Sequence, residues 1–282
     1  MQLKMIMFLI GIFFITFLLC PVYAFAWGPL THIYLGNEIL SLSALIPAGI
    51  IKIIRRHKKD FLYGTLMADL IVGKKYLPEH KNAHNWDFAL ELLKNAETQQ
   101  QKAFAYGYLS HLAADTVAHD IYTADRKNIG HTLLEMKADS IIDRKYWKQA
   151  IAIDKTVQLR NDIFLEKLLE RYIFSFKTNK KILKGMVYLS VLNTRKIADF
   201  IDNNIVTSLP LREAIEKLHQ ESLERIIDLF RNWEKSEVIK INPSGKVHRK
   251  SVLSNEFKTF LFKPFKLSAK AHKKTGSHFS FR

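Results

Sequence analysis

The chain has 282 residues, of which 48% are apolar and 25% charged, a composition typical of a globular protein that buries a sizeable core. Its formal net charge is +16, and Cys20 is the only cysteine. One cysteine excludes an intrachain disulfide and a zinc site built from several thiolates, so any metal must bind histidine, carboxylate or backbone groups.

The first 26 residues have the pattern of a secretory signal peptide. Lys4 is their only charge, an apolar run extends from Met5 to Cys20, and the small-residue ending is Ala24-Phe25-Ala26. An uncleaved membrane anchor is the alternative, but the run is short against the roughly 20 residues of a spanning helix. Lipid attachment at Cys20 is a further alternative. We expect cleavage after Ala26 and export to the periplasm or the extracellular space.

Residues 27–241 are expected to form one all-α domain of several helices. Apolar residues recur there at spacings of three and four, which indicates helix, and strand patterns are scarce. The expected helices lie at about 30–46, 87–95, 103–119, 131–151, 158–175, 179–204 and 210–235.

Residues 242–282 are expected to form a basic, partly disordered tail after a linker at Asn242-Pro243-Ser244-Gly245. From Lys240 to Arg282 there are eleven Lys or Arg residues and one acidic residue, so this end supplies +10 of the net charge. Aromatic residues alternate with lysines between Phe257 and Leu267. That composition suits an anionic membrane surface, and it also suits a nucleic-acid backbone.

The strongest candidate site is formed by His111, Asp115 and His119, which are four residues apart on the helix expected at 103–119. Four residues advance a helix by about 400°, so the three side chains share one face. Their neighbours are apolar, and burying such groups without partners is costly. A bound metal is one solution, and bonds to the backbone and to each other are the alternative. His131 and Glu135 form a second pair, one helical turn apart.

Four further residues, all earlier in the sequence than this helix, extend the candidate set. Asp69 and His84 are weak signals singly, because an aspartate at a helix end is usually a cap and an isolated histidine is usually structural. Trp27 would become the N-terminal residue after cleavage, and its amine and carbonyl can then chelate a metal together with His32. Without cleavage, Trp27 would be a core residue and His32 a capping residue.

Taken together, these residues resemble the zinc-dependent phospholipase C family and the related fungal single-strand nucleases over about residues 27–140. The resemblance implies a helical protein that holds three zinc ions. Only three residues separate Asp115 from His119. This spacing is shorter than in the better-known members of the family. It is closer to the spacing in more distant members that resemble the phospholipase D acting on glycosylphosphatidylinositol anchors. Asp139, one turn after Glu135, is a spare carboxylate. The resemblance assigns the ions to Trp27, His32 and Asp115; to Asp69, His84, His111 and the shared Asp115; and to His119, His131 and Glu135.

The expected function is that of a secreted, phospholipase C-like phosphodiesterase. Zinc-activated hydroxide would attack the phosphodiester, and Asp69 would orient or deprotonate the attacking water as the catalytic residue. We expect a monomer that acts on a phospholipid, with nucleic acid as the alternative substrate. A non-catalytic, zinc-stabilised protein that associates with membranes is the alternative of another class. A cytosolic His-Asp phosphohydrolase is disfavoured by the export signal.

Overall fold

The computed structural model describes residues 27–70, 84–118, 138–169, 181 and 212–243. The chain divides into two compact units, Met1–Gly245 and Lys246–Arg282, and every described residue belongs to the first. The expected signal peptide, nearly all of the expected helix at 179–204 and nearly all of the expected tail therefore lie outside the described residues.

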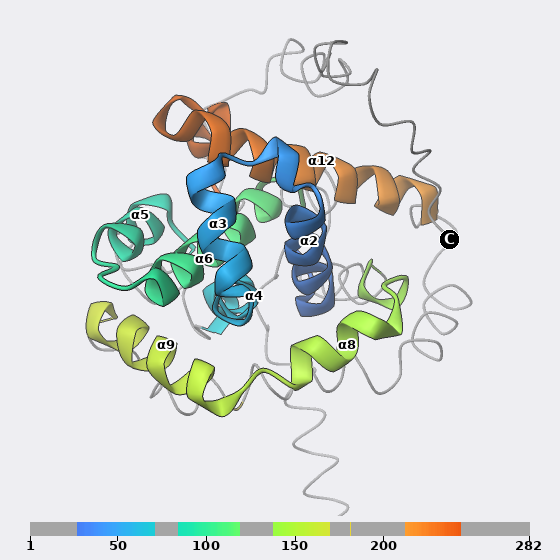
Figure 1. Ribbon diagram of the computed structural model, residues 1–282. Helices are drawn as coiled ribbons and strands as arrows, with labels where there is room; N and C mark the ends of the chain where they lie inside the picture. The colour runs from blue at the N-terminus through green and yellow to red at the C-terminus, as the bar shows by residue number, and fades with distance from the viewer. Residues whose placement is uncertain (1–26, 71–83, 119–137, 170–180, 182–211, 244–282) are drawn as a thin grey trace, which may run out of the picture. The chain divides into compact units, whose positions relative to one another are not determined.

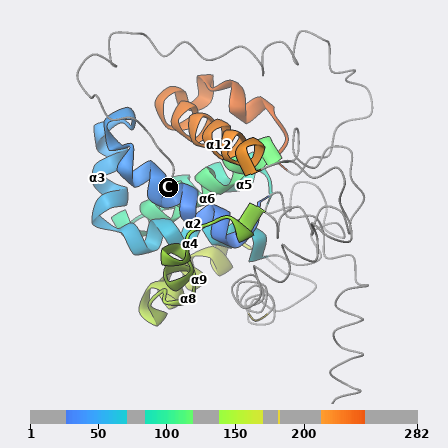
Figure 2. The same ribbon diagram turned by 90° about the vertical axis from the view of Figure 1, so that its right-hand side faces the viewer.

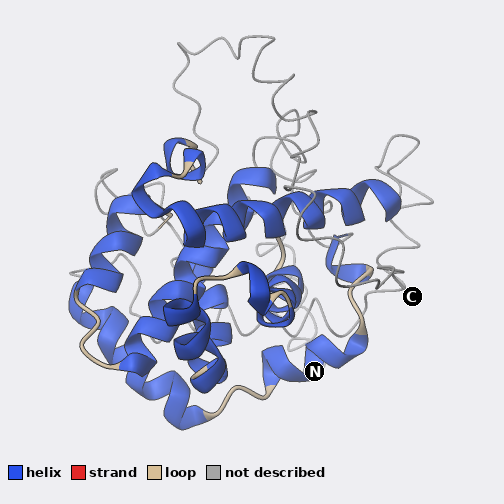
Figure 3. Cartoon of the chain, turned by 45° about the horizontal axis from the view of Figure 1, so that its top comes forward, coloured by secondary structure: helices blue, strands red, loops and turns tan. Residues whose placement is uncertain are grey.

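The described part of the chain consists of helices and connecting loops and contains no strand, in agreement with the expected all-α class (Figures 1 and 3). None of its helices is both long and apolar enough to span a membrane. The α-helices are α2 (Pro29–Ser41), α3 (Ala48–Arg56), α4 (Lys58–Met67), α5 (Trp86–Lys94), α6 (Gln99–Val117), α8 (Arg144–Ile151), α9 (Lys155–Leu168) and α12 (Arg212–Asn232). The 3-10 turns are η1 (Ser43–Leu45), η2 (Ala68–Leu70), η6 (Trp233–Lys235) and η7 (Glu237–Lys240).

Three helix boundaries differ from the expected ones because of capping side chains. α6 begins at Gln99, earlier than expected, because Thr98 and Gln101 form a capping box at its start. The helix expected at 131–151 is wrong as a single element, since residues 141–143 are not helical and Asp143 caps a new helix, α8. Asp154 caps α9 in the same way, so α9 begins at Lys155.

The structure also contains two helices, α3 and α4, that were not predicted from the sequence. α2 ends at Ser41, and Pro47 precedes α3. In α4 every residue from Asp60 to Met67 is buried. A helix buried on all sides has no alternation of polar and apolar faces, so its sequence lacks the periodic signal of an amphipathic helix.

α4 and α6 pack closely against each other at the centre of the described helices (Figure 1). A Cβ atom on Gly64 would lie 2.0 Å from the carbonyl oxygen of Phe104, and one on Gly107 would lie 2.0 Å from that of Phe61. Only glycine permits so close an approach of two backbones. α2, α5, α9 and α12 pack around this pair, and α12 contacts both α6 and α2 (Figure 2).

A buried carboxylate ties α9 to α4. Asp60 is 1% exposed and accepts bonds from Arg160 at 2.7 and 2.6 Å and from the Asn161 amide at 2.7 Å. The Asp60 carboxylate is satisfied within the described residues without any cation other than the arginine. It is therefore a structural use of a buried aspartate.

Candidate metal centre

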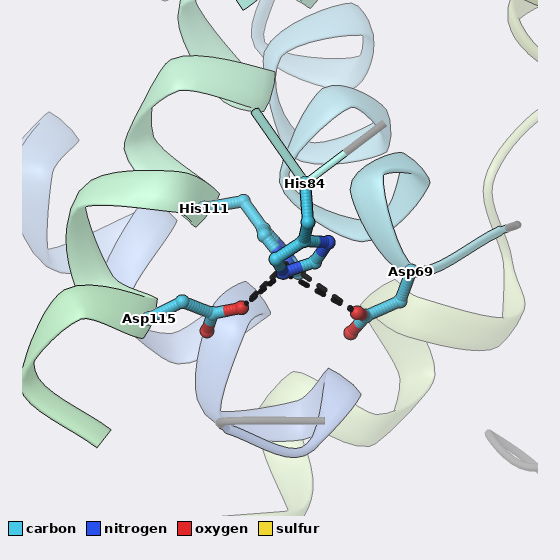
Figure 4. Close-up of side chains that lie close together, drawn as sticks. All are labelled: Asp69, His84, His111 and Asp115. Atoms are coloured by element: carbon cyan, nitrogen blue, oxygen red, sulfur yellow. Dashed lines mark hydrogen bonds and ion pairs between the residues drawn. The ribbon is translucent and has the colours of Figure 1, made fainter. Parts of the chain in front are cut away.

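Four side chains from separate parts of the sequence converge in the interior of the protein (Figure 4). Asp69 comes from η2, His84 lies two residues before α5, and His111 and Asp115 are one turn apart on α6. One potential ligand atom from each lies within 4.8 Å of all the others. All four residues are buried, with exposed fractions between 0% and 3%. They have the composition and spacing of a metal site.

The two histidines direct the same ring nitrogen, Nε2, toward the carboxylates. His111 Nε2 lies 3.0 Å from Asp115 Oδ2 and 3.6 Å from Asp69 Oδ1. His84 Nε2 lies 2.6 Å from Asp115 Oδ2 and 3.2 Å from His111 Nε2. Two nitrogens and two carboxylate oxygens therefore surround a common point (Figure 4).

The opposite ring nitrogens are bonded to backbone carbonyl oxygens. Nδ1 of His111 lies 2.8 Å from the carbonyl oxygen of Thr65, and Nδ1 of His84 lies 3.2 Å from that of Ala68. A carbonyl can only accept, so each Nδ1 carries a proton. In the neutral form of each ring, Nε2 is then left with its lone pair, which is the arrangement of metal-binding histidines.

His32 of α2 joins the cluster from the other side of Asp115. Its Nε2 atom lies 3.2 Å from Asp115 Oδ1, and its ring stacks on that of His111 with the centroids 3.7 Å apart. Asp115 therefore directs one oxygen toward His84 and His111 and the other toward His32. The resemblance to zinc-dependent phospholipases implies that Asp115 is shared between two ions, and this geometry is compatible with that expectation.

Three buried polar atoms of the cluster make no hydrogen bond of good geometry to a described residue: Asp69 Oδ1, and the pair His32 Nε2 and Asp115 Oδ1, which lie 3.2 Å apart. Buried polar atoms without partners are uncommon and costly. The two carboxylate oxygens are lone-pair donors, and His32 Nε2 is one when the proton of the neutral ring is on Nδ1, so bound cations would satisfy all three. A set of nitrogen and oxygen ligands without thiolate suits zinc.

The electrostatics of the cluster favour a positive charge at its centre. Burial acts to lower the pKa of His111, but the charges of Asp115 and Asp69 outweigh it and raise the pKa to about 10. Burial acts to raise the pKa of Asp115, yet His111 and His32 hold it well below its usual range. Burial lowers the pKa of His32, and His111 lowers it further. In the metal-free protein, one proton on His111 therefore occupies the place that a metal cation would take.

Trp27 is fully buried beside this cluster. Its indole Nε1–H donates to the carbonyl oxygen of Ala114 and to Ser222 Oγ, both at 3.1 Å. Ala114 directly precedes Asp115, so the indole is bonded to the backbone of the bridging residue's own helix. On α12, the buried ring of His219 lies edge-on to the indole with the centroids 5.1 Å apart.

A family model described as zinc dependent phospholipase C matches residues 31–180 of the chain. The chain belongs to the zinc-dependent phospholipase C family. The searches of curated proteins and of solved structures found no match. The span matched to the family contains His32, Asp69, His84, His111 and Asp115, whereas Trp27 and α12 lie outside it.

The structure thus brings together five of the nine residues expected to bind zinc and places a sixth, Trp27, beside them. The other three, His119, His131 and Glu135, lie outside the described residues, and their role stays a prediction. Asp139, the spare carboxylate, directs both of its oxygens to the start of α2. Ser222 and the carbonyl of Thr65 were not predictable from the sequence, because a hydroxyl and a backbone oxygen have no distinctive spacing.

Proposed function

We propose that the chain is a secreted zinc-dependent phosphodiesterase that cleaves phospholipids in the manner of a phospholipase C. One observation carries the proposal: four ligand atoms of buried histidines and aspartates lie within 4.8 Å of one another in a member of a zinc-dependent family. The buried Oδ1 atom of Asp69, which makes no hydrogen bond to a described residue, supports it, since an apo scaffold with no need for metal would leave fewer buried lone pairs unsatisfied.

We assign up to three zinc ions to the candidate ligands. The best supported ion would be held by Asp69, His84, His111 and Asp115. A second would be held by His32, the other oxygen of Asp115, and the amine and carbonyl of Trp27 after signal-peptide cleavage. The third would use the candidates outside the described residues: His119, His131 and Glu135.

When bound, zinc would lower the pKa of a coordinated water toward neutrality and neutralise charge on the phosphodiester oxygens. The protein's own groups keep that chemistry in place. The carbonyl oxygens of Thr65 and Ala68 fix the rings of His111 and His84 with Nε2 directed inward. Both carboxylates of the four-residue cluster are buried and stay ionised, so they balance the charge of the metal.

Asp69 is the candidate general base. It is 3% exposed, and with one carboxylate oxygen directed to the cluster the other could orient or deprotonate an attacking water. Burial acts to raise the pKa of Asp69, but the positive charge of His111 outweighs burial and lowers it. The group is therefore a carboxylate at neutral pH, the form that a base requires.

Phospholipid is the preferred substrate because the family is one of phospholipases and because the lysines and aromatic residues of 257–267 suit an anionic membrane surface. The pattern of residues 1–26 supports export. Residues 257–267 and 1–26 lie outside the described part of the chain, so these two arguments come from the sequence.

Two forms of the protein test the proposal, one that begins at Trp27 and one that retains Ala26 before it. Zinc per chain is measured by elemental analysis, and hydrolysis is measured with phosphatidylcholine vesicles, a chromogenic phosphodiester and single-stranded DNA. We expect the first form to hold about three zinc ions and to cleave the phospholipid. The second form should lose about one ion and the activity, because its residue 27 has no free amine.

Asp69→Asn provides the matched catalytic variant and Asp87→Asn the control, since Asp87 is exposed in the first turn of α5. The first substitution should abolish hydrolysis and the second should leave it unchanged. Zinc bound without hydrolysis of any substrate would favour the non-catalytic, zinc-stabilised protein. Hydrolysis of DNA alone would favour the nuclease. Only trace zinc in both forms would contradict the proposal.

A further inference from the structure

The helix α2, which carries His32, has no capping side chain of its own. Its N-cap residue is Gly28 and its first residue is Pro29, so nothing nearby in sequence accepts the N–H groups of the first turn. An acceptor comes instead from Asp139. Its Oδ2 atom accepts from the Leu30 N–H at 3.2 Å, and its Oδ1 atom accepts from both the N–H and the hydroxyl of Thr31 at 2.8 Å.

The Asp139 carboxylate also occupies the space where a side chain of residue 28 would lie. A Cβ atom on Gly28 would be 2.3 Å from Oδ2, 2.4 Å from Cγ and 2.6 Å from Oδ1 of Asp139. The backbone of Gly28 is extended with φ −72°, which any residue can adopt. Residue 28 therefore needs to be glycine because of this contact and for no conformational reason.

The carboxylate is buried, with 1% of its residue exposed. Burial raises the pKa of Asp139 to about 6, although its bonds to Thr31 and Leu30 act in the opposite direction. At neutral pH the group is ionised, and its charge lies against the positive end of the α2 dipole. Asp139 thus supplies to α2 both the acceptors and the charge that a local N-cap aspartate would supply.

Two candidate metal ligands flank the backbone that Asp139 holds. His32 directly follows Thr31, and Trp27 directly precedes Gly28. The other side of Trp27 is fixed by the bonds of its indole to Ala114 and Ser222. The segment from Trp27 to His32 is therefore held at both ends by groups far away in the sequence.

We infer that Asp139 is a positioning residue of the metal centre, which caps α2 from outside the helix and thereby fixes His32 and the backbone of Trp27 relative to Asp115. This inference rests on the proposed function, because the geometry it preserves matters only if zinc binds there. A purely structural cap would contribute to stability and leave the metal site unchanged. The two roles therefore differ in what a substitution does to metal binding.

The experiment compares Asp139→Asn with Asp60→Asn in the protein that begins at Trp27. Asparagine keeps the shape of aspartate but turns an NH₂ group toward one of the two N–H donors, which breaks the cap. Asp60 is the matched control, since it is also a buried aspartate that accepts three bonds from another helix and it lies in a cluster separate from the metal centre. Zinc affinity is measured by competition with a chromophoric chelator, and thermal unfolding is recorded alongside.

We expect Asp139→Asn to weaken zinc binding by about tenfold or more, the usual effect of removing a group that orients a metal ligand. Asp60→Asn should lower the unfolding temperature with zinc affinity unchanged within about twofold. Gly28→Ala should weaken zinc binding as Asp139→Asn does, because it displaces the carboxylate without removing it. Equal zinc affinity for wild type and Asp139→Asn would overturn the inference.

A second readout needs no zinc. In the metal-free protein, the ring-proton chemical shifts of His32 report its stacking on His111, and they should change in Asp139→Asn but not in Asp60→Asn. If the wild type binds no zinc, the proposed function fails, and an unchanged His32 spectrum would overturn the inference as well. If Asp139→Asn does not fold, Thr31→Val removes only the hydroxyl bond and should weaken zinc binding by about threefold. No loss in that variant would contradict the positioning role.

Discussion

The close contact of α4 and α6 predicts that a single methyl group at Gly107 destabilises the protein. In Gly107→Ala the added Cβ atom would lie 2.0 Å from the Phe61 carbonyl oxygen, 2.9 Å from the Thr65 nitrogen and 3.0 Å from the Gly64 Cα atom. Non-bonded heavy atoms prefer separations of about 3.5 Å or more, so the helices must move apart by about 1.5 Å. All three atoms belong to backbone, and no side-chain rotation can relieve the clash.

Overpacking of this kind costs about 3 kcal/mol. For a domain of this size, that loss corresponds to a decrease of roughly 6–12 °C in the midpoint of thermal unfolding. The metal centre should also respond, because His111 follows Gly107 by one helical turn and its Nδ1 atom is bonded to the Thr65 carbonyl across the same contact. Zinc affinity should therefore fall together with stability.

Gly49→Ala is the matched control for this prediction. Gly49 lies near the start of α3, is exposed, and has nothing within 4 Å of the position that a Cβ atom would take. The same substitution there should stabilise the protein by roughly 0.5 kcal/mol, since alanine is the better helix former. Differential scanning calorimetry of the wild type and both variants measures the contrast. If Gly107→Ala unfolds at the wild-type temperature, the inferred closeness of the two helices is wrong.

Four further predictions concern the cluster and its surroundings. Trp27→Phe keeps an aromatic ring but removes the indole donor to Ala114 and Ser222. The free energy of unfolding measured in urea should therefore fall by about 1–2 kcal/mol. An unchanged urea midpoint would contradict those bonds. In the metal-free protein the pKa of His111 is raised to about 10. An unfolded histidine titrates near 6.5, so the stabilisation from this group is complete below about pH 6.5 and is lost as the pH rises through 10. Urea unfolding of the apo protein at pH 7 and pH 10 tests that sign. Because zinc must displace the same proton, zinc affinity should rise by up to about tenfold per pH unit between pH 7 and 9, and calorimetry in buffers of different ionisation enthalpy counts the proton released. Asp115→Asn removes a charge that raises the pKa of His111, so nuclear magnetic resonance should find that pKa lower, and zinc affinity should fall; an unchanged pKa would refute the pairing.

The part of the site that was predictable from the sequence is the part with local geometry. His111 and Asp115 are four residues apart on a helix, and this spacing alone places both on one face. Asp69 and His84 carried little information singly, and only the order of the whole set linked them to α6. The structure brings all four together, because α4 and η2 lie against α6 and His84, two residues before α5, contacts His111.

Contacts between residues distant in sequence were not predictable. Gly64 and Gly107 act as a pair, yet each alone is an ordinary helical glycine. Asp139 was expected only as a spare ligand, because nothing in its neighbourhood in sequence indicates that it caps α2 from 109 residues away. The helix α4 was not predicted because it is buried on all sides, and such burial removes the amphipathic pattern.

Other differences came from local signals that the hydrophobic pattern outweighed. Thr98 and Gln101 form a capping box that marks the start of α6, and Asp143 marks the start of α8. Both caps lie in polar stretches that interrupt the apolar pattern, and interpreting Thr98 and Asp143 as cap residues would have corrected the helix boundaries. The helix expected at 131–151 combined two periodic stretches across the second of these caps.

We propose that Asp69, His84, His111 and Asp115 hold a zinc ion in the interior of the protein. Anomalous diffraction at the zinc absorption edge, on crystals of the chain that begins at Trp27, locates such an ion. We expect an anomalous peak at about 2.0–2.2 Å from the Nε2 atoms of His84 and His111 and from one oxygen each of Asp69 and Asp115. Zinc-saturated crystals with no peak between these four residues would contradict the proposed site.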